Sequence, residues 1–343
     1  MIIANATGCS SIWGGTFPTI PYAVNKDGYG PTWANSLFED NAEYGYGMRL
    51  AVDANRALLH ARIKEALAVN VGGELENLLK EIISLWDTKG DEIKAASKKL
   101  KELLPGLIAS ADAKKQEILT RILNLQSYIV PKSVWAIGGD GWAYDIGFGG
   151  LDHVLASNRN VNILVLDTEV YSNTGGQASK ATPLGSVARF AEAGKTTKKK
   201  DLGLIMMSYG YVYVAAVAMG ANKNQFLKAV KEAEEYDGPA IIIAYAPCIN
   251  HGCNMELTQA EEKKAVDTGY WILYRYNPLL KAEGKNPLIL DSRKPSLPVE
   301  EFLKGEKRYT SLKLSFPDLA EKYWKEQQVI VDERYEQYRK MVE

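Results

Sequence analysis

Two short apolar runs, at residues 134–139 and 162–167, constrain the fold more than any other feature of this sequence. VWAIGG and NILVLD are largely continuous rather than alternating, which is typical of strands buried on both faces of a parallel sheet. Three similar runs predict further strands: GLIMMS at 203–208, YVYVAAV at 211–217 and AIIIAYA at 240–246. A helical pattern at 222–236 precedes the last run. This alternation favours a three-layer α/β fold, with helices on both faces of a mostly parallel sheet.

The first part of the chain changes composition near residue 49. Residues 1–48 are rich in Gly, Trp, Tyr and Asn without a regular period, so we expect long loops with short elements there. Beyond them, apolar residues recur every three or four positions, and we expect breaks at Gly90 and Pro105. The pattern predicts helices near 50–68, 74–86, 92–107 and 113–130.

A second change of composition lies near residue 269. From there the chain is rich in Lys, Pro and Glu, and it ends in an amphipathic helical pattern at 318–343. We therefore interpret residues 1–268 as one domain that carries a helical insertion at about 72–128. Residues 269–343 are interpreted as a carboxy-terminal extension.

Composition excludes several classes of protein. The 343 residues are 46% apolar and carry a formal net charge of only -1, which argues against a general nucleic-acid binder. No apolar run approaches the roughly 20 residues that span a bilayer, and the amino end does not resemble a secretory signal. Three scattered cysteines are too few for a disulfide framework, so we expect a reducing, cytoplasmic setting without membrane contact.

The densest group of chemically useful residues lies at 138–177, around the two buried runs. The first run delivers Asp140 between two glycines, which let a ligand approach the backbone, and the start of the next helix suits a phosphate. The second run is followed by residues 168–173 (TEVYSN). Because adjacent parallel strands end at one edge of the sheet, a carboxylate, a hydroxyl, an amide and a carbonyl would converge there. Such oxygen ligands suit octahedral Mg²⁺.

A Gly-Asp-Gly followed after about thirty residues by an asparagine is the signature of enzymes that bind thiamine diphosphate. By itself Gly-Asp-Gly is also a common turn, so a turn followed by a polar loop is the alternative. Its position between two buried strands favours the cofactor.

Four stretches resemble the pyruvate:ferredoxin (flavodoxin) oxidoreductases: WANSLFEDNAEYGYGM at 33–48, the block from GGDGWAYD to SKATP at 138–183, SYGYVYVAAVAMGANK at 208–223 and AYAPCINHG at 244–252. The resemblance covers nearly the whole chain. It implies the thiamine-diphosphate-binding fold and the carboxy-terminal, diphosphate-holding part of such an enzyme. It also implies Mg²⁺ and a [4Fe–4S] cluster as further cofactors.

The same resemblance assigns individual residues. It implies that Asp140, Thr168 and the Val170 carbonyl hold Mg²⁺, and that Asn173 lies beside the reacting carbon and the substrate as the catalytic candidate. The residues expected to contact the cofactors are Cys9, Gly139, Asp140, Gly141, Trp142, Thr168, Glu169, Val170, Tyr171, Ser172 and Asn173.

The cysteines match the family only in part. Cys9 and Cys248 correspond to two of the four thiolates that hold the cluster nearest the thiamine. In the family the other two come from a Cys-x-x-Cys upstream of this sequence, and the glutamate that activates the aminopyrimidine lies on a further domain. Cys253 could substitute as a ligand, but it does not match the pattern, and a lone loop thiol is usually only a thiol.

The start of the chain at Met1–Ala4 reads like the interior of a strand, so we expect one part of a larger enzyme that is inactive alone. In the family, pyruvate is oxidatively decarboxylated with coenzyme A to acetyl-CoA and CO₂, and electrons pass through iron–sulfur clusters to ferredoxin or flavodoxin. The expected partners are the remaining domains, a second copy of the enzyme, that electron carrier, pyruvate and coenzyme A. The alternatives are a non-catalytic assembly module, an enzyme for another 2-oxoacid, and a non-redox thiamine enzyme.

Two other features are open at this point. His60 and His153 lie in predicted helices, where packing or surface roles are usual, and His251 beside Cys248 is interpreted as supporting that cysteine. The basic run Lys195–Lys200 could attract coenzyme A or an acidic ferredoxin, although such runs are usually solvated loops.

Overall fold

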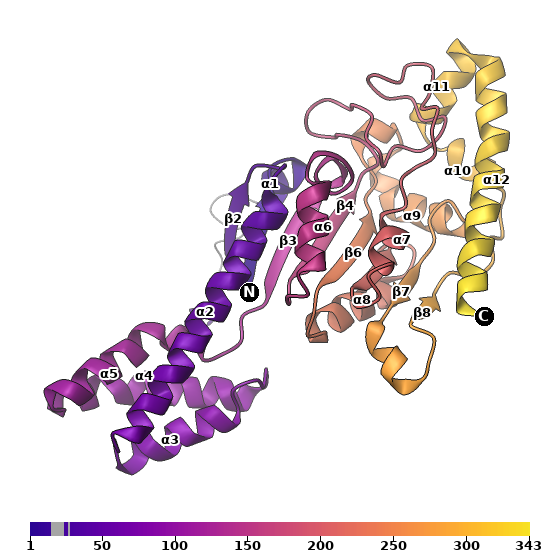
Figure 1. Ribbon diagram of the computed structural model, residues 1–343. Coiled ribbons are helices and arrows are strands. Elements are labelled where there is room, and N and C mark those ends of the chain that lie inside the picture. Colours follow the sequence, from indigo (N-terminus) through magenta and orange to yellow (C-terminus); the bar gives the residue numbers. More distant parts are fainter. Residues whose placement is uncertain (15–23, 27) are drawn as a thin grey trace. The chain divides into compact units, whose positions relative to one another are not determined.

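The computed structural model describes residues 1–14, 24–26 and 28–343, and their contacts divide the chain into two compact units. Unit 1 comprises Met1–Tyr46 and Val134–Glu343, and unit 2 comprises Gly47–Ser133. Each unit has its own hydrophobic core. Figure 1 shows the elements of both units coloured along the chain.

Unit 1 is built on an eight-stranded sheet with the strand order β2-β1-β3-β4-β6-β5-β7-β8. The first six strands in this order are parallel to their neighbours, whereas β7 and β8 are antiparallel. The strands are β1 (Ile2–Ala6), β2 (Thr32–Ser36), β3 (Val134–Gly139), β4 (Asn162–Asp167), β5 (Tyr213–Val217), β6 (Ala240–Tyr245), β7 (Tyr274–Tyr276) and β8 (Leu288–Leu290).

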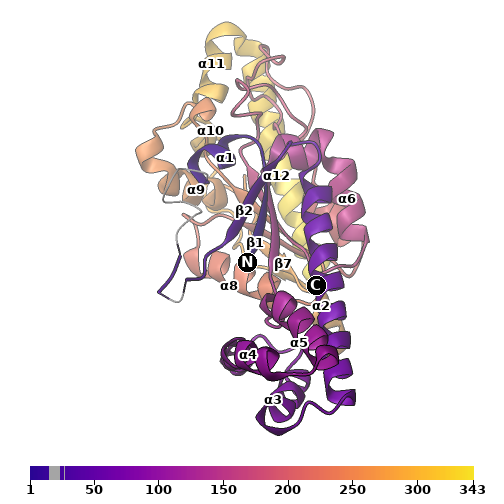
Figure 2. The same ribbon diagram turned by 90° about the vertical axis from the view of Figure 1, so that its left-hand side faces the viewer.

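Helices cover both faces of this sheet because successive side chains of a buried strand point to opposite sides. On β6, Ile241 and Ile243 join the core beneath α6, α7, α10 and α12, whereas Ala240 and Ile242 pack with α8. Figure 2 shows α8 on the opposite side of the sheet from α6 and α12. The helices of unit 1 are α1 (Cys9–Gly14), α6 (Phe148–Ala156), α7 (Leu202–Met207), α8 (Lys223–Glu235), α9 (Thr258–Asp267), α10 (Glu300–Leu303), α11 (Lys307–Ser315) and α12 (Pro317–Val342). The predicted three-layer α/β fold is confirmed.

The strands predicted at 134–139, 162–167, 211–217 and 240–246 are present, but the prediction of a strand at 203–208 was wrong. That segment is helix α7, and the side chain of Asp201 caps it by accepting a hydrogen bond from Leu204 N at 2.9 Å. A run of six residues is too short for its periodicity to separate a buried helix from a buried strand. The capping aspartate was the signal that decides between them.

The loops predicted for residues 1–48 also give way to a helix near their end. Helix α2 (Asn41–Ala68) already begins at Asn41. A Cβ at Gly45 would meet the Ala4 and Ala136 side chains at 3.4 and 3.2 Å, so glycine lets the start of α2 lie close against β1 and β3. Gly45, one of the glycines that suggested a loop, is therefore a packing contact within a helix.

Unit 2 is helical, as predicted, and its core is almost wholly apolar. It contains most of α2 together with α3 (Gly73–Ser84), α4 (Asp91–Ser110) and α5 (Ala113–Leu125). The expected break at Pro105 is absent, because α4 runs through it. Pro105 and Lys101 are both exposed, so the carbonyl that proline leaves without an N–H partner can bond to water instead.

The compact units do not follow the expected boundaries. The helical unit begins at Gly47 rather than near residue 72, because α2 belongs to it for most of its length. Residues 269–343 belong to unit 1, because β7 and β8 extend its sheet. Arg275 of β7, nearly buried, joins them to α8 through Glu232 at 2.6 Å and to Asp291 at 2.9 Å.

Within the described parts of the chain, no helix combines the length and the apolar character needed to cross a membrane.

Candidate functional site

Four neighbouring strands deliver the predicted site residues to one edge of the sheet. The order β1-β3-β4-β6 places parallel strands side by side, so their carboxyl ends meet. Asp140 follows β3 directly, and the segment 168–173 follows β4. Cys9 comes three residues after the end of β1 and Cys248 three residues after the end of β6. We call residues 168–173 the metal loop.

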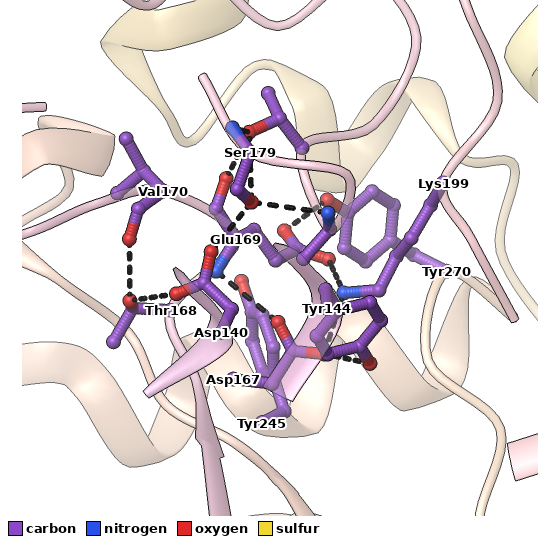
Figure 3. A network of polar contacts seen from close by, with 12 residues as sticks. Asp140, Tyr144, Asp167, Thr168, Glu169, Val170, Ser179, Lys199, Tyr245 and Tyr270 are labelled. Carbon is purple, nitrogen blue, oxygen red and sulfur yellow. Dashed lines mark hydrogen bonds and ion pairs between the residues drawn. The ribbon is translucent and has the colours of Figure 1, made fainter. Parts of the chain in front are cut away.

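Three oxygen atoms converge where β3 and β4 end. The Thr168 hydroxyl oxygen lies 2.9 Å from Asp140 Oδ1 and 2.9 Å from the Val170 carbonyl oxygen (Figure 3). A hydroxyl has one hydrogen, so it cannot donate to both oxygens at once. Adjacent corners of a Mg²⁺ octahedron lie about 3 Å apart, since Mg–O distances are about 2.1 Å. The distances from the Thr168 hydroxyl to the other two predicted ligands therefore suit this ion.

Among the described residues, no cationic side chain is hydrogen-bonded to the Asp140 carboxylate. The residue is 1% exposed, and within the described parts of the chain the only groups at hydrogen-bonding distance from its carboxylate are hydroxyls, those of Thr168 at 2.9 Å and Ser179 at 2.5 Å. Burial, reinforced by the nearby Asp167, raises the pKa of Asp140 to about 7. A cation bound at this carboxylate would favour its ionised form. The residues present thus fit a divalent metal.

Glycines around Asp140 are required by packing as well as by access. A Cβ at Gly138 would lie 2.4 Å from the Trp142 ring, and one at Gly141 would lie 2.3 Å from the Tyr171 ring. At Gly139 the nearest atom would be the Leu166 carbonyl oxygen, at 3.9 Å. Gly139 therefore leaves open space beside the ligand oxygens. The chain continues into a short π-helix, Gly141–Ile146, rather than the expected α-helix.

A cavity of about 440 Å³ opens over these oxygens. Its wall contains every predicted site residue except Glu169: Cys9, Gly139, Asp140, Gly141, Trp142, Thr168, Val170, Tyr171, Ser172, Asn173 and Cys248. The wall also includes Phe38, Pro247, Ile249 and Met255, which sequence reasoning did not single out. The tertiary structure thus brings together residues that lie up to 239 positions apart in the sequence, since Cys9 and Cys248 share one wall.

Cys9 lies beside the catalytic candidate Asn173, and Cys248 lines the same cavity. The Ser172 hydroxyl donates to Cys9 Sγ at 3.3 Å, and the Cys9 thiol lies 3.8 Å from Asn173 Oδ1. Burial, with a smaller contribution from Cys9, raises the pKa of the Cys248 thiol. Cys253 lies next to Met255, with 4.0 Å between the sulfur atoms.

Glu169 points away from the cavity into a buried network of charges. Its backbone is left-handed, with φ 58°, which is uncommon for a residue other than glycine. Its carboxylate accepts from Tyr270 at 2.5 Å, Arg308 at 2.8 Å and Lys199 at 2.9 Å. Burial alone would raise the pKa of Glu169, but the two cations outweigh it and lower that pKa to about 2. These contacts hold the metal loop in its strained conformation.

One member of the lysine run, Lys199, is part of this network, and two others, Lys195 and Lys200, donate to backbone carbonyls. Lys199 contacts Asp167 at 2.7 Å as well as Glu169, as Figure 3 shows. Lys195 donates to the Ser179 carbonyl at 2.7 Å, and Lys200 to the Tyr144 carbonyl at 3.1 Å. Lys198, which pairs with Glu333 at 3.2 Å, is exposed.

Sequence reasoning missed Ser179 and Arg308, and it placed Lys199 in a run interpreted as a ligand-attracting or solvated loop rather than as a buried counter-charge. Ser179 lies inside the block 138–183 that resembles the family, so its position there was an available signal. Arg308 lies 139 residues after its partner Glu169, and no local pattern connects the two.

Across residues 1–14, 24–26 and 28–343, no group of three or more His, Cys, Asp or Glu side chains could hold a metal ion. The convergence described above contains only one such side chain, Asp140, because its other ligands are a hydroxyl and a carbonyl. The described cysteines provide two thiols at the cavity, Cys9 and Cys248.

The fold is that expected of a thiamine-diphosphate-binding domain. Residues 125–244 match the family described as thiamine pyrophosphate enzyme, C-terminal TPP binding domain, and this stretch contains β3, β4, Asp140 and the metal loop. The resemblance predicted from the sequence is confirmed: over its whole length the chain matches part of the pyruvate:ferredoxin and pyruvate-flavodoxin oxidoreductases.

Similarity to these enzymes extends over the whole chain. It is 58% identical to the pyruvate:ferredoxin oxidoreductase of Moorella thermoacetica, over 100% of this chain and 29% of that protein. It is 53% identical to the pyruvate-flavodoxin oxidoreductase of Trichormus variabilis, over 98% of this chain and 28% of that protein. The mitochondrial pyruvate dehydrogenase (NADP+) of Euglena gracilis is 48% identical over 100% of this chain and 19% of its own length.

The chain spans less than a third of the length of these relatives. Among solved structures, the 2-oxoglutarate:ferredoxin oxidoreductase of Magnetococcus marinus overlaps 73% of this chain and 55% of its own, with a TM-score of 0.41 and 17% identity.

Proposed function

We propose that this chain binds the diphosphate of thiamine diphosphate through Mg²⁺ and supplies that half of the active site of a pyruvate:ferredoxin-type oxidoreductase. The observation that carries the proposal is the convergence of Asp140 Oδ1, the Thr168 hydroxyl and the Val170 carbonyl at 2.9 Å spacings. They lie in the wall of a cavity with residues from three further loops. The match of residues 125–244 to a TPP binding domain supports the same cofactor.

Each part of the site has a role in this proposal. Asp140, Thr168 and Val170 hold the metal, and the chain around Gly139 and Ser172 contacts the diphosphate and the thiazolium. Asn173 faces the substrate from the end of the metal loop. Cys9 and Cys248 supply two of the thiolates of a [4Fe–4S] cluster, and other parts of the enzyme supply the rest. The bound cofactor provides the electron sink for decarboxylation, and the protein orients it.

The expected reaction is the oxidation of pyruvate with coenzyme A to acetyl-CoA and CO₂. Pyruvate occurs in the names of the relatives, whereas their named electron acceptors are ferredoxin, flavodoxin and NADP+. We therefore assign the choice of electron acceptor to the rest of the enzyme. The other proposed partners are the remaining domains and a second copy of the enzyme. Cys9, Cys248 and Cys253 are free thiols, which suits a reducing, cytoplasmic setting.

Calorimetric titration with thiamine diphosphate, with and without Mg²⁺, tests the proposal. Asp140→Asn keeps the shape of the side chain and removes its charge, and Asp237→Asn makes the same change at an exposed position. We expect Mg²⁺-dependent binding by the wild type and by Asp237→Asn. Asp140→Asn should weaken it at least about a hundredfold, because a buried ligand charge is lost.

Undiminished Mg²⁺-dependent binding by Asp140→Asn would refute the site. If the isolated wild type does not bind, the same substitution at the matching aspartate of an intact relative decides. Loss of binding there shows that the half-site needs its partner domain. Normal binding there refutes the site.

The second candidate function is a folded cofactor-binding module without turnover. The chain spans only 29% of the Moorella relative, which favours this function for the chain alone. Pyruvate-dependent dye reduction separates the two functions. We expect none from this chain by itself and restored activity when the rest of the enzyme is supplied. A 2-oxoacid other than pyruvate that gives the higher kcat/KM in the restored enzyme would change the proposed substrate.

A further inference from the structure

His251 is a buried side chain that the proposed cofactor chemistry does not use. It is 0% exposed and ends the short turn Cys248–His251, which we call the cysteine turn. Its Nε2 lies 2.6 Å from the carbonyl oxygen of Thr168, the residue whose hydroxyl is a proposed metal ligand. A carbonyl oxygen only accepts, so Nε2 must carry the hydrogen. This holds for both the neutral and the charged imidazole.

The other ring nitrogen faces groups on both sides of the cysteine turn. Nδ1 lies 3.4 Å from the Cys248 backbone nitrogen and 3.3 Å from Glu306 Oε1. Glu306 is held by Arg308 at 2.6 Å, and Arg308 reaches Glu169 at 2.8 Å. Glu169 is the residue after Thr168. Nδ1 can accept from the Cys248 N–H or donate to Glu306, but not both, so these neighbours lead back to the metal loop without forming an unbroken ring of hydrogen bonds.

A second side chain of the cysteine turn contacts the same loop. Asn250 Nδ2 donates to the Ser172 carbonyl oxygen at 3.2 Å and lies 3.6 Å from Cys248 Sγ. The Asn250 backbone N–H also faces that sulfur, at 3.5 Å. The cysteine turn is thus attached to both ends of the metal loop, at Thr168 and at Ser172.

We propose that His251 is a positioning residue that fixes the position of the metal loop relative to the Cys248 thiol. It does so through its bond to the Thr168 carbonyl and its place in the turn that carries Cys248. The inference rests on the proposed function, because that function makes the metal loop a cofactor site and Cys248 a cluster ligand. The physical coupling between loop and turn does not depend on that function.

Such a coupling has a direct chemical use. A cofactor held by the metal loop and a cluster held in part by Cys248 would need a reproducible separation, and the two segments that would hold them follow different strands. A buried hydrogen bond between β4 and β6 loops fixes that separation, because breaking it leaves a polar group without a partner. His251 is therefore expected to affect both sites at once.

Two substitutions separate this role from simple packing. His251→Gln can still extend an N–H to the Thr168 carbonyl, whereas His251→Asn is too short to reach it. Asn250→Ala removes the second attachment at an exposed position, where folding is not at risk. His153→Asn, at an exposed histidine of α6, is the matched control.

Three readouts on the full chain are needed. The first is amide hydrogen exchange across residues 165–178 without any ligand. The second is the alkylation rate of Cys248 in a Cys9→Ser, Cys253→Ser background, where it is the sole thiol. The third is the affinity for thiamine diphosphate with Mg²⁺. We expect His251→Asn to change each by roughly tenfold, the size expected when one buried hydrogen bond is lost, and His251→Gln to stay within about threefold of wild type.

The outcomes are distinct. Faster exchange and faster alkylation in His251→Asn, with recovery in His251→Gln and a smaller effect of the same sign in Asn250→Ala, support the proposal. Equal effects of His251→Gln and His251→Asn would show a packing role and overturn it. If His251→Asn does not fold, an unchanged Asn250→Ala chain overturns it. Failure of thiamine binding by the wild type would count against the proposed function alone, because the first two readouts use no ligand.

Discussion

The carboxyl edge of the sheet in unit 1 and the helical core of unit 2 are each stabilised by a different kind of interaction. Around the metal loop, Asp167, Glu169, Lys199, Glu306 and Arg308 are largely buried and satisfy one another at specific distances. Unit 2 instead buries side chains such as Leu79, Ile82 and Ile122, each 0% exposed, in one apolar cluster. Charged contacts need defined geometry, whereas apolar contacts depend mainly on volume.

This contrast follows from what each region has to do. A site that holds a metal and a diphosphate needs oxygen atoms at defined positions, and a rigid polar surround supplies them. Such a surround is not an efficient way to gain stability, since buried ion pairs lose much of their attraction to desolvation. The helical unit carries no comparable group of charges and can be stabilised by burial alone.

Arg308→Met should have the largest effect, and it would sharpen the contrast. It leaves Glu169 and Glu306 buried without their shared cation, so we expect the free energy of unfolding of unit 1 to fall by about 3–5 kcal/mol. Hydrogen exchange should accelerate across residues 162–173 and stay unchanged in unit 2. Arg339→Met, at an arginine that is 40% exposed, should leave the free energy of unfolding nearly unchanged. Equal costs for the two variants would contradict this account.

Leu79→Ala is the corresponding test of unit 2. The side chain is 0% exposed, so its truncation should cost about 2–5 kcal/mol and accelerate exchange in α3, α4 and α5. Leu79→Met, which nearly conserves volume, should cost less than about 1.5 kcal/mol. Leu58→Ala, at a leucine of α2 that is 44% exposed, is the control for helix propensity. A large cost for Leu79→Met would show that unit 2 also depends on defined geometry.

Arg56→Lys tests whether unit 2 also depends on a charged group with defined geometry, the Arg56 guanidinium. Arg56 donates to the carbonyl oxygens of Trp86 and Ile129 at 2.7 Å and of Tyr128 at 2.9 Å, and it lies 4.6 Å from the centre of the Trp86 ring. An ammonium group cannot span these acceptors, so we expect a loss of about 1–3 kcal/mol. Thermal unfolding of the wild type and the variant measures it. No loss would mean that the apolar cluster alone holds unit 2.

The smallest expected effect is a difference between Lys200 and Lys199 in the rate of reaction with an amine-reactive label. Burial lowers the pKa of Lys200 from its ordinary value of 10.5 to about 8, whereas Asp167 and Glu169 overcome burial and raise the pKa of Lys199. At pH 8 an amine-reactive label should therefore modify Lys200 faster than Lys199, and lowering the pH to 6 should suppress the reaction. Because the folded chain releases the Lys200 proton more readily than the unfolded chain, this group adds stability as the pH rises from about 8 towards 10.5. Peptide mass spectrometry resolves the two lysines, and equal labelling would contradict the assigned burial.

Much of the site could be predicted because its determinants are local. Asp140 and Thr168 each follow a buried apolar strand within a residue or two, so the end of the strand fixes where they lie. The resemblance to a known family added Cys9 and Cys248, which no local pattern could place. The prediction failed where a segment had two local solutions of similar merit, as in α7, where the Asp201 cap decided for a helix.

The sequence by itself determined the α/β class, the buried strands β3, β4, β5 and β6, and most of the residues that line the cavity. Only the tertiary structure decided that Glu169 turns inward, that Lys199 is a buried counter-charge and that residues 306–308 support the metal loop. The physical reason is that a strand or helix is selected by neighbours within a few residues. A buried charge is tolerated only when its partners are in place, and here those partners lie 30 and 139 residues along the chain from Glu169.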